Sequence, residues 1–294
     1  MMESCQPGIL AEVPPLARYL TFTIKSNHLV KARMSVLIDL VDGVHTVCGI
    51  GQSLVLALAK GVPGLGTFPA SIGAGFAVPS TPAALWFWLK GADRGELMYR
   101  SRTIERQLAP AFHMSHGVDA FKYKTGFDLS GYEDGTENPQ AQRAVDAAIV
   151  QGKGAGLDGS SFVAVQLWVH DLDLFEQLPE REQDNTIGRR KRDNQEIGDA
   201  PQSAHVKRAA QESFQPEAFI LRRSMPWAAG QDAGLVFVAF GKSLTAFESI
   251  LTRMTGAEDG VADALFKFTQ PVTGSYYWCP PLQNQRLNLS LLGF

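Results

Sequence analysis

The chain has 294 residues, and 45% of them are hydrophobic, which is enough for one large or two ordinary domains with a substantial core. Its formal net charge of -3 is too small to favour binding to nucleic acid or to an anionic membrane surface. The 3 cysteines, Cys5, Cys48 and Cys279, are far apart and odd in number. They therefore argue against both a disulfide framework and a metal-binding pair.

The sequence offers no targeting or membrane signal. No uncharged apolar run approaches the roughly 18 residues that a transmembrane helix needs. The first residues lack a basic segment followed by an apolar one, so we expect no secretory signal. Together with the unpaired cysteines, this predicts a cytoplasmic protein.

The first half of the chain predicts alternating strands and helices. Residues 19–25 alternate between apolar and polar side chains, which indicates a strand. A helix should follow, capped by Ser26 or Asn27, because apolar residues recur at helical spacing after that point. Further along, the pattern predicts a strand at 45–51, a short helix at 53–60, a strand at 84–89, a helix at 93–108 and a strand at 112–118.

The second half repeats this order less clearly. Its expected elements are a strand at 162–170, a helix at 171–178, strands at 218–223 and 235–240, a helix at 244–254 and a strand at 276–279. With the short helix at 53–60 set aside, the order is that of a ferredoxin-like unit. We therefore predict an α+β fold of two ferredoxin-like domains, 1–125 and 126–294, each an antiparallel sheet covered by helices.

A long polar insertion, at about 179–216, interrupts the second half. Its length and charge fit a disordered, solvated loop. Long loops inside domains are also often functional, so both interpretations stay open.

The most informative segment is the loop Gly131-Tyr132-Glu133-Asp134-Gly135-Thr136-Glu137-Asn138-Pro139. It is polar and contains glycines, so it can present the Asp134 carboxylate on a tight, fixed turn. The segment closely resembles the signature of dye-decolourising peroxidases, a haem-enzyme family marked by Gly-x-x-Asp-Gly. Tyr132 departs from the family pattern, in which Phe is more usual at this position.

The resemblance implies a haem-dependent peroxidase that reduces hydrogen peroxide and oxidises dye-like or phenolic donors. It implies the same paired ferredoxin-like domains, one haem b per chain and a haem site mainly in the second half. Three other functions remain as alternatives: a haem- or iron-handling protein on the same fold, a chlorite dismutase-type enzyme, and an oligomerisation module without a cofactor.

The resemblance also implies residues on the ligand side of the haem. His205, in Ser203-Ala204-His205-Val206, follows an Ile-Gly-Arg-x-Lys segment as in the family, and this implies that it ligates the haem iron. The same segment implies that Arg189 pairs with a haem propionate. Asp263 is expected to accept a hydrogen bond from the second nitrogen of His205, although an ordinary aspartate at a helix start fits equally well.

On the peroxide side, the family carries Arg-x-Asn or Arg-x-Ser before an apolar-Pro pair. This implies that Arg222 contacts the haem and stabilises charge as the O–O bond breaks, and that Ser224 is a hydrogen-bonding partner, although several members have Asn there. Asp134 would be the acid–base group, which predicts an acidic optimum of activity. Phe237 would line the apolar wall or be an ordinary core residue.

Assembly and location are inferred from the same family. Antiparallel sheet edges and the resemblance suggest a homo-oligomer, a dimer or larger. Some relatives enter encapsulin shells through a C-terminal peptide, but the tail Leu287–Phe294 gives no clear sign of that signal. Aromatic residues toward the C-terminus, Tyr276, Tyr277 and Trp278, together with Trp227, are expected to be packing residues more often than electron relays.

Overall fold

The computed structural model describes residues 4–73 and 75–294. Its α-helices are α1 (Pro7–Leu10), α2 (Asn27–Leu40), α3 (Gln52–Ala57), α4 (Arg94–Leu108), α5 (Gln142–Ala148), α6 (Leu172–Gln177), α7 (Glu180–Ile187), α8 (His205–Arg208) and α9 (Thr245–Met254). Its strands are β1 (Leu16–Ile24), β2 (Thr46–Ile50), β3 (Ser71–Gly73), β4 (Phe76–Val78), β5 (Leu85–Gly91), β6 (Phe112–Phe121), β7 (Ser161–His170), β8 (Leu221–Arg222), β9 (Met225–Ala229), β10 (Asp232–Gly241), β11 (Thr269–Pro271), β12 (Ser275–Cys279), β13 (Leu282–Gln283) and β14 (Arg286–Leu287). Short 3-10 helices are η2 (Gln211–Ser213), η3 (Ala264–Lys267) and η4 (Ser290–Leu292).

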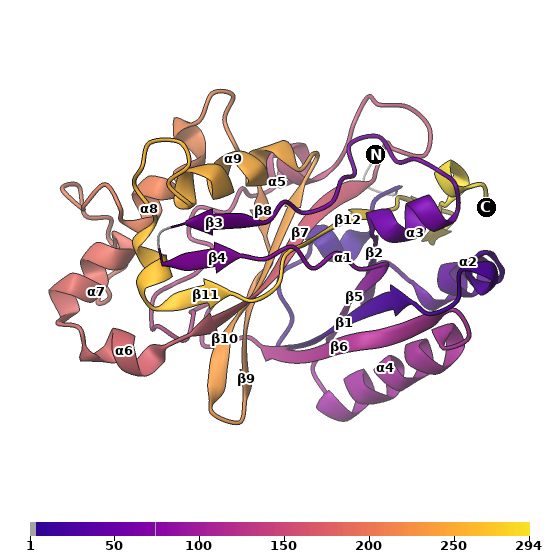
Figure 1. Cartoon of the computed structure of the whole chain (residues 1–294), viewed down its shortest axis with the longest axis horizontal. Coiled ribbons are helices and arrows are strands. Elements are labelled where there is room, and N and C mark those ends of the chain that lie inside the picture. The colour runs from indigo at the N-terminus through magenta and orange to yellow at the C-terminus, as the bar shows by residue number, and fades with distance from the viewer. Residues whose placement is uncertain (1–3, 74) are drawn as a thin grey trace.

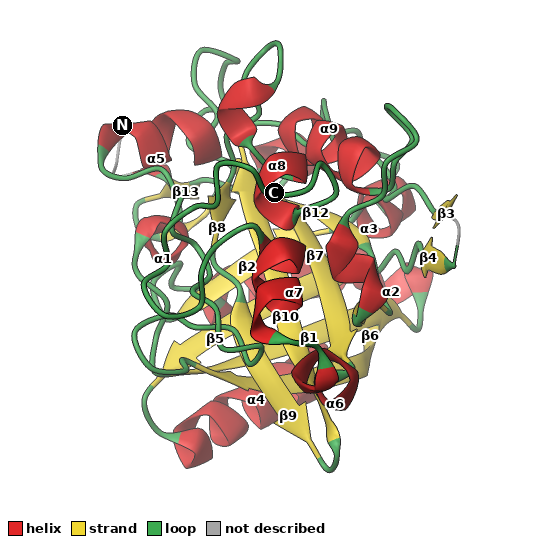
Figure 2. Cartoon of the chain, turned by 90° about the vertical axis from the view of Figure 1, so that its left-hand side faces the viewer, coloured by secondary structure: helices red, strands yellow, loops and turns green. Residues whose placement is uncertain are grey.

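Most strands belong to one antiparallel sheet of 10 strands, in the order β11-β7-β12-β2-β5-β1-β6-β9-β10-β8. Strand β10 also pairs with β7, from Gly234 opposite Val169 to Gly241 opposite Phe162. This extra pairing closes the sheet on itself into a barrel-like arrangement. In Figure 2 the strands run through the middle of the molecule and the helices lie around them.

The two halves of the chain have the same local strand order. The first half has β2-β5-β1-β6 and the second has β9-β10-β7-β12. Numbered within each half, both orders read 2-3-1-4, as a strand–helix–strand–strand–helix–strand unit gives. The predicted α+β class with antiparallel strands and covering helices is confirmed. However, β12 pairs with β2 and β9 with β6, so the halves share one sheet and leave fewer unpaired edges.

The helices form where the sequence carries caps and apolar stripes. Helix α2 buries Val30, Met34 and Leu37, the face that the spacing predicts. Helix α4 begins where the Asp93 side chain accepts a hydrogen bond from the Glu96 amide at 2.9 Å. Figure 1 shows α6, α7, α8 and α9 gathered at one end of the molecule, while α2 and α4 lie at the other.

The sheet is buried on both faces. Neighbouring residues of a strand enter different apolar clusters: Tyr19 packs in one cluster and Leu20 in the other. The same alternation separates Trp86 from Phe87. On one face of the second half of the sheet, residues of β7 and β10 line a cavity together with residues of α7, α8 and α9.

Residues 179–216, for which the sequence leaves two interpretations open, are folded: the segment contains α7, α8 and η2, and Ile187 packs against a cluster of Tyr132, Phe175 and Phe268. Strand β9 was not predicted because Pro226 lies within it, and proline normally argues against a strand. The predicted strand at 218–223 shortens to β8.

Across residues 4–73 and 75–294, no helix combines the length and the apolar character that crossing a membrane requires.

Candidate active site

A cavity of about 460 Å³ lies beside the second half of the sheet. Every residue in its wall falls between Asp128 and Thr269. Trp168, Phe247 and Phe268 contribute apolar surface, while carboxylates and basic groups gather in other parts of the wall. A cavity of this size, largely apolar with a few convergent polar groups, is typical of a cofactor or ligand site.

The structure brings together most of the site residues predicted from the sequence. The wall of the cavity includes Asp134, Arg189, His205, Arg222 and Phe237. These residues come from separate elements: the loop before α5, the end of α7, the start of α8, and strands β8 and β10. Asp263 and Ser224 are outside the wall, and their positions are described below.

His205 is held by a buried carboxylate. Its Nδ1 lies 2.8 Å from Oδ2 of Asp263, whose side chain is fully buried. The other carboxylate oxygen of Asp263 accepts a hydrogen bond from the Leu265 amide at 2.9 Å, which caps η3 and fixes the acid. Since a carboxylate only accepts, the proton of a neutral imidazole sits on Nδ1 and Nε2 keeps its lone pair. This is the arrangement of a histidine that ligates a metal.

Gly188 lets the end of α7 lie close to Val206, the residue that follows His205. Gly188 ends α7 with a φ of 93°, and a Cβ there would lie 2.4 Å from Cγ2 of Val206. Both the backbone conformation and the close contact therefore favour glycine at this position.

We expect Gly188→Ala to lower the free energy of unfolding by about 1–3 kcal/mol, because it combines a strained φ with a clash. Chemical denaturation checks this value. The matched control is Gly198→Ala, because an added Cβ at that exposed residue would meet no atom within 4 Å. Equal stabilities of the two variants would contradict the prediction.

Arg208 anchors the other end of α8. Its guanidinium forms two hydrogen bonds to the Asp259 carboxylate, of 2.8 and 2.7 Å, and one to the carbonyl of Arg253 at 2.6 Å. The hydrogen bond from Arg208 lowers the pKa of Asp259 to about 2. These contacts tie the helix of His205 to the segment after α9, a connection that sequence reasoning missed.

Asp134 and Arg222 face each other across the cavity wall. Arg222 Nη1 lies 3.7 Å from Oδ1 of Asp134, and both side chains are mostly buried. The turn is shaped by Gly135, which has a φ of 80°. The Asn138 side chain donates to the carbonyl of Arg222 at 3.1 Å and accepts from its amide at 2.8 Å. Asn138 thus connects the loop that carries Asp134 to strand β8, which carries Arg222.

Arg189 is already bound by acidic groups. It donates to Glu137 at 2.6 Å and lies 3.6 Å from Glu196. A further hydrogen bond of 2.9 Å goes to the carbonyl of Asn194. Any anionic group that Arg189 holds must therefore share it with these carboxylates.

Ser224 and Phe237 differ from each other in their access to the cavity. Phe237 lies in the wall and packs against Phe247, with ring centroids 6.0 Å apart. Ser224 is not part of the wall, and its hydroxyl accepts a hydrogen bond from the Val238 amide at 3.3 Å. The structure therefore does not bring Ser224 to the cavity with the other predicted residues, because its hydroxyl is turned to the backbone of the neighbouring strand.

Comparisons with known proteins agree with this site. Residues 125–284 match the family model described as Dyp-type peroxidase, C-terminal. A dye-decolorizing peroxidase from Rhodococcus erythropolis is 30% identical over 286 residues, which cover 95% of this chain and 80% of the relative. The chain belongs to the dye-decolourising peroxidase family.

Solved structures show the same fold along nearly the whole peroxidase. A dye-decolorizing protein from V. cholerae has a TM-score of 0.85 at 28% identity, covering 97% of this chain and 98% of that one. A variant of DypB from Rhodococcus jostii, solved in complex with haem, has a TM-score of 0.85 at 25% identity, covering 92% of this chain and 94% of that one.

Three buried polar groups in the wall of the peroxidase cavity have no hydrogen-bond partner within the described part of the chain. They are Nε2 of Gln166, Nε1 of Trp168 and Nε of Arg222. Buried donors are normally paired, so their state fits a cavity that takes a polar or charged ligand. The donor set also fits haem, because His205 offers one nitrogen to a metal whose other ligands a porphyrin would supply. Residues 4–73 and 75–294 hold no group of at least three His, Cys, Asp or Glu that could bind a bare metal ion.

A second buried pair links the loop of Asp134 to the end of β7. Nε2 of His170 lies 3.0 Å from Oδ1 of Asp128, and Nδ1 of His170 lies 2.5 Å from the Thr269 hydroxyl. Asp128 also accepts a hydrogen bond from the Ser130 amide at 2.8 Å. Burial opposes ionisation of Asp128, but the hydrogen bond and charge of His170 outweigh this effect and lower the pKa of Asp128. In the sequence, the only signal for this pair was a histidine at a strand end.

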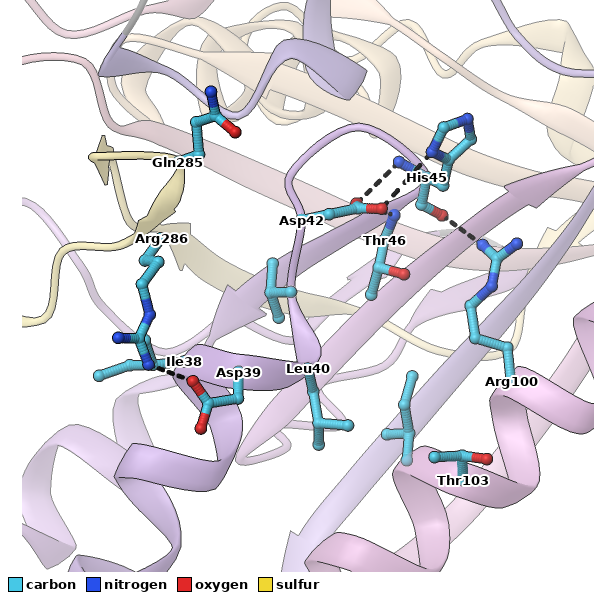
Figure 3. Close-up of a pocket in the computed structure, with 12 residues that line it drawn as sticks. Ile38, Asp39, Leu40, Asp42, His45, Thr46, Arg100, Thr103, Gln285 and Arg286 are labelled. Carbon is cyan, nitrogen blue, oxygen red and sulfur yellow. Dashed lines mark hydrogen bonds and ion pairs between the residues drawn. The ribbon is translucent and has the colours of Figure 1, made fainter.

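An open hollow in the first half of the peroxidase is less suited to chemistry (Figure 3). It has a volume of about 490 Å³, but its charged side chains Asp39, Asp42, Arg100 and Arg286 already have partners within the protein. Arg286 pairs with Asp39, and Arg100 donates to the carbonyl of His45 at 2.9 Å. Asp42 accepts hydrogen bonds from backbone amides of the following turn. The second-half cavity is therefore the candidate active site.

Proposed function

We propose that this chain is a haem-dependent peroxidase that reduces hydrogen peroxide with electrons from dye-like or phenolic donors. Its family membership supports the reaction. The haem complex of the similar DypB variant supports the cofactor. The observation that carries the proposal for this chain is the convergence of the His205–Asp263 pair with Asp134 and Arg222 on one cavity.

Three residues would hold the cofactor. His205 would ligate the iron through Nε2, with Asp263 fixing its orientation and raising its basicity. Arg189 would share a propionate with its present carboxylate partners, and Phe237 would contact the porphyrin. We propose one haem b per chain, held within residues 126–294. Bound haem supplies the electron-transfer chemistry, while the protein supplies ligation, proton movement and electrostatics.

Asp134 and Arg222 would act on the peroxide. The Asp134 carboxylate takes the proton from one peroxide oxygen and delivers it to the other, so that a water molecule can leave. The Arg222 guanidinium is fixed beside this acid, at 3.7 Å, and stabilises negative charge that develops as the O–O bond breaks. Ser224 would support this side through the backbone of β10, since its hydroxyl accepts from Val238.

The division of the chain into domains is also a proposal. We propose two ferredoxin-like units, 1–125 and 126–294, of which the second carries the cofactor; the matching strand orders support this. Aromatic donors, homo-oligomeric assembly, a cytoplasmic location and carriage by an encapsulin shell stay predictions.

Replacing His205 with alanine tests the cofactor site. After loading with haem, we expect wild type to show a histidine-ligated Soret spectrum and His205→Ala to lose it, with added imidazole restoring it. His113→Ala, which changes an exposed histidine on β6, is the matched control.

Stopped-flow absorbance with peroxide and a phenolic donor then tests the reaction. Turnover by wild type supports the peroxidase. Tight haem binding without peroxide turnover would instead favour a haem-handling protein, and an unchanged spectrum in His205→Ala would remove this residue from the site.

A further inference from the structure

Tyr132 is a tyrosine in the cavity wall with a carboxylate at its hydroxyl. Its side chain is almost fully buried, with 4% exposure, and it lies two positions before Asp134. The hydroxyl donates a hydrogen bond of 2.6 Å to Oδ1 of Asp184 in α7. Of the 6 tyrosines in the chain, all in the described residues, Tyr132 alone lines the cavity.

This contact is part of a fixed arrangement. The same oxygen of Asp184 accepts a hydrogen bond from the Lys191 amide at 2.9 Å, so the acid is held from the chain that follows α7. The Tyr132 ring packs edge-on against Phe175, with centroids 6.1 Å apart, and the Lys191 ammonium lies 5.5 Å from the ring centroid. The phenol therefore has one orientation, with its proton directed to one acceptor.

The environment keeps Tyr132 protonated until it is oxidised. Burial raises the pKa of Tyr132 well above its ordinary value, and the hydrogen bond and charge of Asp184 raise it further. A neutral phenol loses an electron readily only when its proton leaves at the same time, because the phenol radical cation is a strong acid. A carboxylate in a short hydrogen bond is well placed to take that proton.

We propose that Tyr132 is a redox-active residue that stores one oxidising equivalent of the peroxidase. This inference rests on the proposed function, because the oxidant is the peroxide-oxidised haem. Tyr132 gives one electron to that oxidant and its proton passes to Asp184, which leaves a neutral tyrosyl radical. The donor later returns one electron, and Asp184 returns the proton, so that Tyr132 and Asp184 are restored.

Freeze-quench electron paramagnetic resonance tests the assignment. The haem-loaded full chain is mixed with one equivalent of peroxide without donor, and ring-deuterated tyrosine identifies any tyrosyl signal. We expect this signal in wild type and its loss in Tyr132→Phe, which keeps the ring and removes only the hydroxyl. Tyr99→Phe is the matched control, since Tyr99 is 76% exposed and is not part of the cavity wall.

Asp184→Asn separates proton transfer from packing. Asparagine can keep the contact but is a poor base, so radical formation should slow by about 100-fold, the lower end of what a positioned base contributes. The initial reaction with peroxide is measured in the same samples, so that slower formation of the radical is distinguished from a slower reaction with peroxide.

An undiminished tyrosyl signal in Tyr132→Phe would overturn the inference, and so would a wild-type rate of radical formation in Asp184→Asn. If wild type turns over peroxide with a donor but gives no tyrosyl signal, the inference fails while the proposed function stands. If wild type does not react with peroxide at all, both fail.

Discussion

Asp134→Asn is expected to lower kcat/KM for hydrogen peroxide by about 10²- to 10⁴-fold, the range that a positioned acid–base group contributes. Asparagine has nearly the same shape but cannot accept the peroxide proton at neutral pH. The free energy of unfolding should fall by about 1 kcal/mol, the usual net contribution of one polar contact, because asparagine keeps nearly the same volume and the ion pair with Arg222 is long, at 3.7 Å. Asp134→Asn is thus expected to lower kcat/KM strongly and to change the free energy of unfolding only slightly.

Steady-state and stopped-flow measurements on the haem-loaded protein check this prediction. Asp146→Asn in α5 is the matched control, since it removes the same charge from an exposed aspartate that accepts a hydrogen bond from the Gln142 side chain. A wild-type kcat/KM in Asp134→Asn would mean that another group moves the proton, and the proposed role of Asp134 would be wrong.

Asp128→Ala is expected to lower the free energy of unfolding by about 3–5 kcal/mol, the usual cost of breaking a buried charge pair. The substitution leaves His170 without its carboxylate and the Ser130 amide without its acceptor. It also frees the loop that carries Asp134, so activity should fall as well. Chemical denaturation measures the loss, with Asp199→Ala as a control at an exposed aspartate, where a change within about 0.5 kcal/mol is expected.

The same pair predicts a pH dependence of stability. The pKa of Asp128 is lowered in the folded protein, so it binds a proton less readily there than in the unfolded chain. Its contribution is present above the ordinary aspartate pKa of 3.8 and is lost as pH falls through the lower folded value. The difference in stability between wild type and Asp128→Ala should therefore shrink below about pH 4. A constant difference across this range would contradict the assignment.

The elements that the sequence predicts well are those with strong local signals. Helix α4 combines a capping aspartate with an apolar stripe, and α2 buries the face that its spacing indicates. Local signals cannot show that β10 returns to β7 and closes the sheet, because this pairing joins strands that are far apart in the chain. The polarity of residues 179–216 does not distinguish a folded segment from a solvated loop, because α7 buries only one face against Phe175 and its neighbours.

The site was predictable to the extent that its residues lie in recognisable motifs. His205, Asp134 and Arg222 were found in this way, and the structure brings them to one cavity. Asn138 was missed although it belongs to the same nine-residue segment, because its role depends on a strand 84 residues away. Gln166 also left a signal, as a lone polar residue in an apolar strand, but only the closed sheet shows that it faces the cavity.

The position of β12 has a consequence for biosynthesis. This strand, Ser275–Cys279, lies near the end of the chain, yet it sits between β7 of the second half and β2 of the first. Until it leaves the ribosome, β2 and β7 each expose an edge that can pair with other chains. The ring of strands therefore cannot close until residues 275–279 have been synthesised, although every residue of the cavity wall, from Asp128 to Thr269, is made before them.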